Sequence, residues 1–313
     1  MDIVLALLAP SQGSQTPGMF TPWLDLPDAR DTVGRWSELT GLDLIRLGTE
    51  ADAEEIKDTA VTQPLVVALA LLAFAELERR TPIPADTVVA GHSVGELAAA
   101  AMAGVLAADD AVALAAVRGR EMAAACALEP TGMAAVLGGE PDEVVAWLAG
   151  FDLIAANRNG AGQIVAAGPL DALDKIVEAT ERPANKVIKL KVAGAFHTRF
   201  MAPAGEAMLE RAKHVRTADP VRPLLSNKDG QAVTTGAEVL TRLVGQVTSP
   251  VRWDACMATF RTLGVTGLAE LPPAGTLTGL AKRDLKGVAA LALKVPADLA
   301  KVAELIAADG SGS

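Results

Sequence analysis

The chain has 313 residues, half of them hydrophobic and 21% charged. This composition is typical of a globular protein, and the length suffices for one large domain or two smaller ones. The formal net charge of -10, without a Lys/Arg-rich run, argues against a nucleic-acid-binding protein. Cys126 and Cys256 stand far apart without a CxxC spacing. We therefore expect neither a metal site nor a disulfide framework, and a reducing cytosol fits.

We expect no targeting or membrane-spanning segment. The apolar run at 3–9 is only seven residues long and has no basic region before it, so it predicts a strand rather than a signal peptide. The alanine-rich run at 66–75 is too short to span a bilayer and is soon followed by charge. Residues 310–313, Gly-Ser-Gly-Ser, predict a flexible tail. A cytoplasmic protein without a membrane partner is expected.

The first part of the chain predicts strands and helices in alternation. Residues 3–8 are continuously apolar, which is typical of a buried parallel strand, and they lead into the polar loop 9–15. Loops at the carboxyl ends of such strands are where α/β folds place their chemistry, although an ordinary connection remains the alternative. The further expected elements are a strand at 88–89 and helical segments within 28–58, at 65–77 (with Pro64 near the first turn) and at 111–126.

Residues Gly91–Gly95 form a Gly-x-Ser-x-Gly motif between a β-branched strand and an alanine-rich helix, the arrangement of a nucleophile elbow. The two glycines allow a tight turn that lifts the Ser93 hydroxyl clear of the backbone. The amide of Val94 then lies at a helix N-terminus, where unpaired N–H groups favour developing negative charge. A chance match is the alternative, but the strand and helix on either side favour Ser93 as a nucleophile.

Residues 130–193 predict the order β-α-β-β-α-β, which is the ferredoxin-like arrangement. We expect this small domain to be inserted into a larger α/β domain, hydrolase-like with a mostly parallel sheet, formed by residues 1–129 and 194–309. The later part of the large domain predicts a strand end at 224–227, a strand at 267–271, and helices at about 203–214, 236–247, 253–263 and from 277.

A serine hydroxyl needs a general base, and the chain has three histidines. His92 adjoins Ser93 at a sharp turn, so its side chain should diverge from the hydroxyl and have a packing or hydrogen-bonding role. His214 lies on a charged, solvated helix. His197, in a loop after the small domain, is left as the base, with a structural histidine as the alternative. No carboxylate is evident to orient it, because Glu96 is expected to point away; a hidden carboxylate or a backbone carbonyl must serve.

With these residues in place, the chain resembles the malonyl-CoA:acyl-carrier-protein transacylases of bacterial type II fatty-acid synthesis, most closely the actinobacterial form. The resemblance covers about residues 3 to 295, and the ordered set of motifs is far more specific than any one of them. The matching pieces are Gln12–Gln15, Thr62–Pro64, Gly91–Glu96, Arg118–Arg120, Gly162–Val165, Phe196–Thr198, Ser249–Trp253 and Gly275–Leu280.

The resemblance implies a Ser-His dyad. Ser93 would be the acylated nucleophile and His197 the general base. The backbone amides of Gln12 and Val94 would form the oxyanion hole. The backbone carbonyl of Gln246 would orient His197, which accounts for the missing carboxylate.

The resemblance also implies that Arg118 pairs with the malonyl carboxylate. A carboxylate entering a partly dry cleft needs a fork-shaped, permanently charged partner, although Arg118 taken alone is typical of a surface arginine near a helix end. Phe196 fits a preference for malonyl over methylmalonyl, since a bulky ring would oppose a branching methyl group. Ser11 stands where the family usually has glycine; if φ there is positive, strain of about 1–3 kcal/mol or a shifted Gln12 amide is expected.

The implied reaction is a ping-pong transfer of malonyl from malonyl-CoA to the phosphopantetheine thiol of an acyl carrier protein by a malonyltransferase. No metal or other cofactor is implied, and a monomer is expected. Carrier proteins are usually acidic, so docking is expected on a local basic patch, with a solvated strand face as the alternative. The candidates are Lys186, Lys189, Lys191 and Arg199.

Two other functions stay open. A serine thioesterase or hydrolase would use the same elbow with water as the acceptor and would not require Arg118. A catalytically weakened carrier-binding protein is conceivable because of Ser11, since the loss of one oxyanion donor costs about 10²–10³ in rate.

Overall fold

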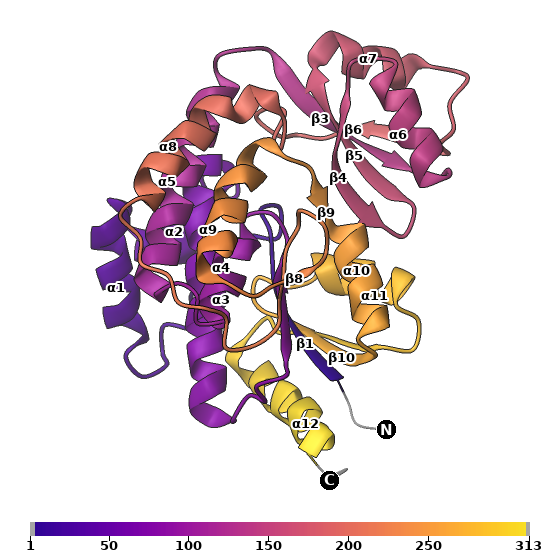
Figure 1. The fold of residues 1–313 in the computed structure, drawn as a ribbon. Coiled ribbons are helices and arrows are strands. Elements are labelled where there is room, and N and C mark those ends of the chain that lie inside the picture. The colour runs from indigo at the N-terminus through magenta and orange to yellow at the C-terminus, as the bar shows by residue number, and fades with distance from the viewer. Residues whose placement is uncertain (1–3, 311–313) are drawn as a thin grey trace.

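The computed structural model describes residues 4–310 and has two sheets (Figure 1). The larger sheet has six strands in the order β11-β10-β1-β2-β7-β8, and all its neighbours are parallel except the β7–β8 pair. This confirms the expected α/β class with a mostly parallel sheet. Its strands are β1 (Val4–Ala9), β2 (Val88–Gly91), β7 (Leu224–Leu225), β8 (Ala232–Val233), β10 (Val265–Glu270) and β11 (Ala289–Ala292).

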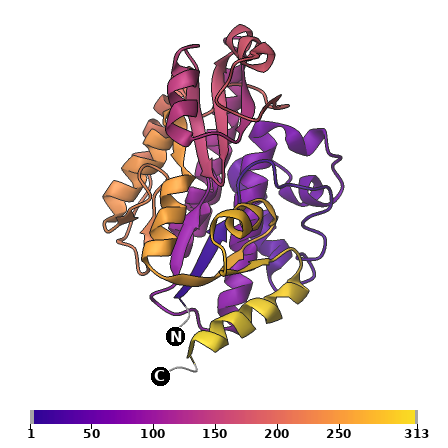
Figure 2. The ribbon, with the colours of Figure 1, turned by 90° about the vertical axis from the view of Figure 1, so that its right-hand side faces the viewer.

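Strand β1 is apolar throughout because helices cover both of its faces. Leu5 and Leu7 point into a core shared with α3 (Thr59–Arg80), α4 (Gly95–Met102) and α5 (Ala108–Cys126). Ala6 and Leu8 point the other way, into a core built on α10 (Trp253–Thr262) and α11 (Thr276–Asp284). Figures 1 and 2 show the sheet between these two layers of helices.

The remaining helices flank this three-layered part or connect its elements. The α-helices are α1 (Ala29–Thr40), α2 (Leu44–Thr49), α8 (Ala202–Ala212), α9 (Gly236–Gly245) and α12 (Leu299–Gly310). Short 3₁₀ turns lie at Glu55–Lys57, Arg199–Met201, Gln246–Thr248 and Pro296–Asp298.

Helix α3 begins earlier than the sequence pattern indicates, and Pro64 lies inside it rather than near its first turn. Asp58 caps the N-terminus by accepting a hydrogen bond from the amide of Ala60 at 2.8 Å. The proline removes only the one hydrogen bond its N–H would have made, and burial of the long apolar helix outweighs a cost of about 3 kcal/mol.

The alanine-rich run at 66–75 was expected to be too short to span a bilayer. It belongs to the 22-residue helix α3, so length alone does not exclude a membrane span. The helix is long and apolar enough to cross a bilayer, but 83% of its most apolar window is buried within the fold. Contacts with α4, α5 and α1 account for that burial, so α3 is placed as a core helix.

The smaller sheet has the ferredoxin-like strand order β6-β3-β5-β4, and β9 (Val251–Arg252) joins its β4 edge. Two helices cover one face around a core of their own (Figure 1). The elements are β3 (Thr131–Leu137), α6 (Pro141–Ala149), β4 (Ile154–Gly160), β5 (Gln163–Pro169), α7 (Leu170–Glu178) and β6 (Lys186–Lys189). The β-α-β-β-α-β order is therefore confirmed. The boundaries at 130 and 193 stay a prediction, and β9 shows that a later segment of the chain contributes to this sheet.

Two terminal expectations are affected. Gly310, predicted to open a flexible tail, ends α12, and residues 311–313 of that tail lie outside the described part of the chain, as do residues 1–3. The sequence pattern gave no element between the helix at 277 and the tail, whereas the structure has β11 and α12 there.

Candidate active site

Five of the seven candidate site residues line one cavity of about 900 Å³ at the carboxyl ends of the parallel strands, while Val94 and Gln246 are not among its lining residues. Ser93, Arg118 and His197 line it from the large sheet's side, while β4 and β5 of the smaller sheet close the opposite wall. Ser11, Gln12 and Phe196 also line it. The site thus lies at the strand edge where the sequence placed it.

Two glycines hold the elbow against its neighbours. A Cβ on Gly91 would lie 2.1 Å from the backbone of Gly95, and a Cβ on Gly95 would lie 2.4 Å from the carbonyl oxygen of Ala9. No side chain fits at either position, so β1, β2 and α4 approach one another closely here. Ser93 occupies the left-handed region with φ of 53°, a strained conformation that costs about 1–3 kcal/mol.

Ser93 and His197 are directly hydrogen-bonded. The Ser93 Oγ lies 2.7 Å from His197 Nε2, and His197 Nδ1 lies 2.9 Å from the backbone oxygen of Gln246. Because a carbonyl only accepts, Nδ1 carries the proton and Nε2 is left to accept one from the serine; this tautomer is assigned from the partners. His197 also has a left-handed φ, 62°.

The imidazole of His197 is held in its neutral form. Burial, with a further contribution from the nearby Arg118 cation, lowers the pKa of His197 to about 3. Near neutral pH the ring therefore has a free lone pair on Nε2, as a general base requires.

Arg118 extends from α5 and is 2% exposed. Its Nη1 donates to Gln63 Oε1 at 2.7 Å, and its Nη2 donates to Gln246 Oε1 at 3.0 Å and reaches Ser93 Oγ at 3.3 Å. Burial lowers the pKa of Arg118 to about 10, so the guanidinium stays charged at neutral pH. The reading of Arg118 as a surface residue is wrong, and a cation stands beside the nucleophile.

The amides of Gln12 and Val94 donate no hydrogen bond to any other residue within 4–310. The Gln12 side chain donates to Thr59 Oγ1 at 3.1 Å and so anchors its loop to α3. Ser11 is not among the described non-glycine residues with positive φ, so the strain considered for it does not arise; Gly13, with φ of 103°, takes the left-handed position of this loop.

Asn227, which follows β7, is hydrogen-bonded to the backbone of the elbow. The sequence analysis did not identify it as a site residue. Its Oδ1 accepts from the Ser93 amide at 2.8 Å and its Nδ2 donates to the Gly91 carbonyl at 2.8 Å. The backbone N–H of Asn227 donates to Glu96 Oε1 at 2.6 Å. The only sequence signal for Asn227 was a polar residue at a strand's carboxyl end.

Glu96 points into this network, so the expectation that it points away is wrong. The carboxylate accepts from Asn227 and from the Gln246 side chain beneath Ser93. Burial raises the pKa of Glu96 to about 8, against these hydrogen bonds and the nearby Arg118 and Arg242 charges, which favour the ionised form. The sequence signal that was missed is the position of Glu96, three residues after Ser93 in the first turn of α4.

The side chains of His92 and His214 make no hydrogen bond with the Ser93 hydroxyl. His92 Nε2 lies 2.9 Å from Asn159 Oδ1, and its ring packs edge-on to Trp253 with centroids 5.6 Å apart. His214 is exposed. Of the three histidines, His197 is the one whose side chain is hydrogen-bonded to the Ser93 hydroxyl; its role as the base stays a prediction.

The basic residues considered for docking are partly neutralised. Lys189 pairs with Asp174, and Arg199 pairs with Asp152 at 3.0 Å. Lys191 is exposed and lines the cavity.

The arrangement suits acyl transfer through a serine ester. The nucleophile Ser93 is hydrogen-bonded to a neutral imidazole. The amides of Gln12 and Val94 are available to an oxyanion, and the buried Arg118 cation can bind an anionic acyl group. No cluster of metal-ligating side chains occurs in the part of the chain that the structure describes.

Comparisons with known proteins agree with this chemistry. A family model described as acyl transferase domain matches residues 8–307. The malonyl CoA-acyl carrier protein transacylase of Mycobacterium tuberculosis is 59% identical over 96% of this chain and 100% of its own length. The crystal structure of that organism's MCAT superposes with a TM-score of 0.91, covering 96% of this chain and 99% of its own.

A more distant solved structure, 27% identical with a TM-score of 0.90, is a malonyl-transacylase in complex with a type II polyketide synthase acyl-carrier protein. It covers 96% of this chain and 99% of its own.

The neutral state of His197 predicts a pH-dependent stability. Between its ordinary pKa near 6.5 and about 3, the unfolded chain binds a proton at this residue and the folded chain does not, so stability falls as pH falls. From pH 7 to pH 5 this contribution amounts to about 2 kcal/mol. His197→Gln removes this titrating group. In urea unfolding, the free energy of unfolding of the variant relative to the wild type should therefore rise by about 2 kcal/mol from pH 7 to pH 5. An unchanged difference between the two proteins at both pH values would contradict a neutral, desolvated imidazole.

Proposed function

The chain belongs to the acyl transferase family, among the malonyl-CoA:acyl-carrier-protein transacylases, and we propose that it transfers malonyl from malonyl-CoA to a carrier-protein thiol through a malonyl-Ser93 ester. The observation that carries the proposal is the position of Ser93 Oγ, 2.7 Å from His197 Nε2 and 3.3 Å from Arg118 Nη2. A candidate base, His197, and a cation that can bind a carboxylate, Arg118, thus lie beside the same hydroxyl.

In the first half-reaction, the Ser93 hydroxyl proton passes to His197 Nε2 as Oγ attacks the thioester carbon. The carbonyl oxygen becomes an oxyanion that the amides of Gln12 and Val94 stabilise. When this intermediate collapses, the carbon–sulfur bond breaks and the coenzyme A sulfur takes the proton from His197. Coenzyme A leaves as the thiol, and the malonyl group remains as an ester.

In the second half-reaction, the carrier thiol gives its proton to His197 and its sulfur attacks the ester carbonyl. Collapse of the second oxyanion breaks the ester bond and returns the proton to Ser93 Oγ. The backbone carbonyl of Gln246 accepts from Nδ1 throughout, so the ring keeps its orientation while Nε2 gains and loses the proton.

Arg118 binds the malonyl carboxylate in both half-reactions. Its guanidinium is planar and charged, which matches a carboxylate better than an ammonium group would. Phe196 lines the same cavity and is 8% exposed. Its ring would oppose a methyl branch next to the carbonyl, an effect worth about 1–3 kcal/mol.

The acyl carrier protein is the partner we propose, and a relative solved as a complex with such a protein supports it. Of the basic residues considered for docking, Lys191 is best placed, because it is exposed and lines the cavity. The carrier can belong to fatty-acid or polyketide synthesis. A monomeric, cytoplasmic enzyme that needs no cofactor remains a prediction.

The two other functions are less well supported. A hydrolase gives no reason to bury an arginine beside the nucleophile, where desolvation is costly. The weakened carrier-binding protein depended on strain at Ser11, and the backbone there is not left-handed.

Mass spectrometry after mixing with malonyl-CoA tests the function. We expect a malonyl-sized adduct on Ser93 that persists and then moves to a phosphopantetheinylated carrier protein, with none on Ser93→Ala. Rapid release of free malonate would favour the hydrolase, and the absence of any adduct would favour the binding protein.

Arg118→Ala tests the carboxylate clamp. Removing one partner of a buried, hydrogen-bonded charge pair costs about 2–5 kcal/mol, so the ratio of malonyl to acetyl transfer, measured as kcat/KM, should fall about 30-fold or more. Equal losses for both acyl groups would exclude a role for Arg118 in binding the carboxylate.

A further inference from the structure

Gln246 supports two functional groups at once. Its backbone oxygen accepts from His197 Nδ1 at 2.9 Å, and its side-chain Oε1 accepts from Arg118 Nη2 at 3.0 Å. The side-chain Nε2 donates to the Ser93 carbonyl at 3.0 Å and to the Glu96 carboxylate. The base and the cation therefore share one supporting residue.

The support for Arg118 depends on which way the Gln246 amide faces. The oxygen and nitrogen ends of an amide are nearly equal in size, so both orientations fit the same space. Only the orientation with Oε1 toward Arg118 gives its Nη2 an acceptor on Gln246; the reverse sets two donors against each other.

Glu96 selects between these orientations. Its Oε1 faces the Asn227 backbone N–H at 2.6 Å and its Oε2 faces the amide nitrogen of Gln246, so both carboxyl oxygens meet donors. A carboxyl proton would displace one of these donors, so the contacts fit the ionised form, which can only accept, although burial raises the pKa of Glu96 to about 8. The Ser93 carbonyl and Asn227 Oδ1, at 3.0 and 3.2 Å from the same amide nitrogen, are neutral acceptors and give weaker preferences in the same direction.

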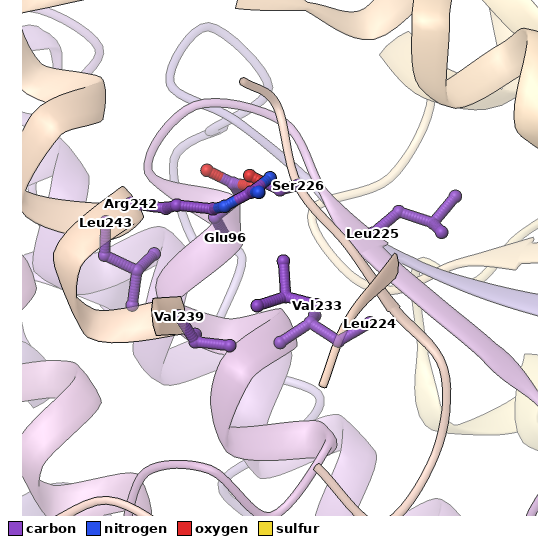
Figure 3. Close-up of a pocket in the computed structure, with 8 residues that line it drawn as sticks. All are labelled: Glu96, Leu224, Leu225, Ser226, Val233, Val239, Arg242 and Leu243. Atoms are coloured by element: carbon purple, nitrogen blue, oxygen red, sulfur yellow. The ribbon is translucent and has the colours of Figure 1, made fainter. Parts of the chain in front are cut away.

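The surroundings keep Glu96 in place and away from water. Figure 3 shows Glu96 with Ser226 and Arg242 at one end of a small pocket, whose other walls are apolar. Arg242 is engaged by Glu238 and Asp229, at 2.7 and 2.8 Å. Glu96 is 5% exposed, so its two N–H donors are strong partners.

We propose that Glu96 is a positioning residue for acyl selection: through the Gln246 amide, it holds the Arg118 guanidinium beside Ser93, where the acyl carboxylate arrives. This inference rests on the proposed function. It also explains why the carboxylate is one residue removed from Arg118. A carboxylate in direct contact with the guanidinium would occupy the place of the acyl group.

Glu96→Gln separates this role from simple packing. The new side chain has nearly the same shape but only one acceptor oxygen for two N–H donors. If that oxygen keeps the Asn227 backbone N–H, the new NH₂ group faces the NH₂ group of Gln246. This repulsion favours turning the Gln246 amide, which would point its own NH₂ group at Arg118. If the oxygen of the new side chain faces Gln246 instead, the Asn227 backbone N–H loses its acceptor, and Asn227 holds the elbow less firmly.

The experiment compares kcat/KM for malonyl and acetyl transfer in the wild type and in Glu96→Gln. We expect the malonyl-to-acetyl ratio to fall about 10- to 100-fold, the range for loss of a hydrogen bond to a charged group. In the Arg118→Ala background, the same substitution should change the ratio by no more than about twofold, because the guanidinium that it positions is already gone. Glu96→Asp, which retains the charge, should recover part of the ratio.

Glu76→Gln is the matched control. Glu76 is a buried carboxylate on α3 that pairs with Arg79 and Arg80 and lies outside the cavity lining, so it should alter stability and leave the ratio unchanged. If Glu96→Gln does not fold by thermal melting, Gln246→Leu takes its place, since it removes the side-chain amide and keeps the backbone carbonyl; it should lower the ratio likewise.

Equal losses of malonyl and acetyl transfer, or an undiminished effect in the Arg118→Ala background, would overturn the positioning role. Failure of the proposed function is distinguishable. In that case the wild type forms no malonyl ester, or Arg118→Ala alone leaves the ratio unchanged.

Discussion

A guanidinium cation buried beside the nucleophile is the interaction on which the rest of the site depends. A buried charge is unfavourable unless its N–H groups have partners. Here the partners of Arg118 are two neutral glutamine oxygens, from Gln63 and Gln246, and the Ser93 hydroxyl. The compensating carboxylate, Glu96, lies beyond an amide. The cation is thus stabilised without being neutralised, and it retains its attraction for an anionic acyl group.

The same cation adds to the effect of burial on the base. Together with burial, its charge keeps a proton off His197, so the imidazole can accept one from Ser93. Ser93 and His197 both have left-handed backbones, although neither is glycine. Such strain persists only where the surroundings fix the backbone. Asn227 does so at the elbow, through hydrogen bonds to the Ser93 amide and the Gly91 carbonyl.

Local chemistry made much of this fold and site predictable. The glycines around Ser93, the apolar run of β1 and the β-α-β-β-α-β order depend on short-range patterns, and the structure has all three. The side-chain role of Gln246 and the inward direction of Glu96 depend on contacts across more than a hundred residues, which no local pattern contains. The start of α3 was missed because tertiary burial outweighed the proline signal.

A crystal structure of Ser93→Ala with malonyl-CoA bound tests the central claim most directly. The account predicts the acyl carboxylate within about 3 Å of the Arg118 guanidinium. It also predicts the thioester oxygen within about 3 Å of the Gln12 and Val94 amides. A carboxylate that faces solvent, or that pairs with another cation while Arg118 keeps its glutamine partners, would contradict the account.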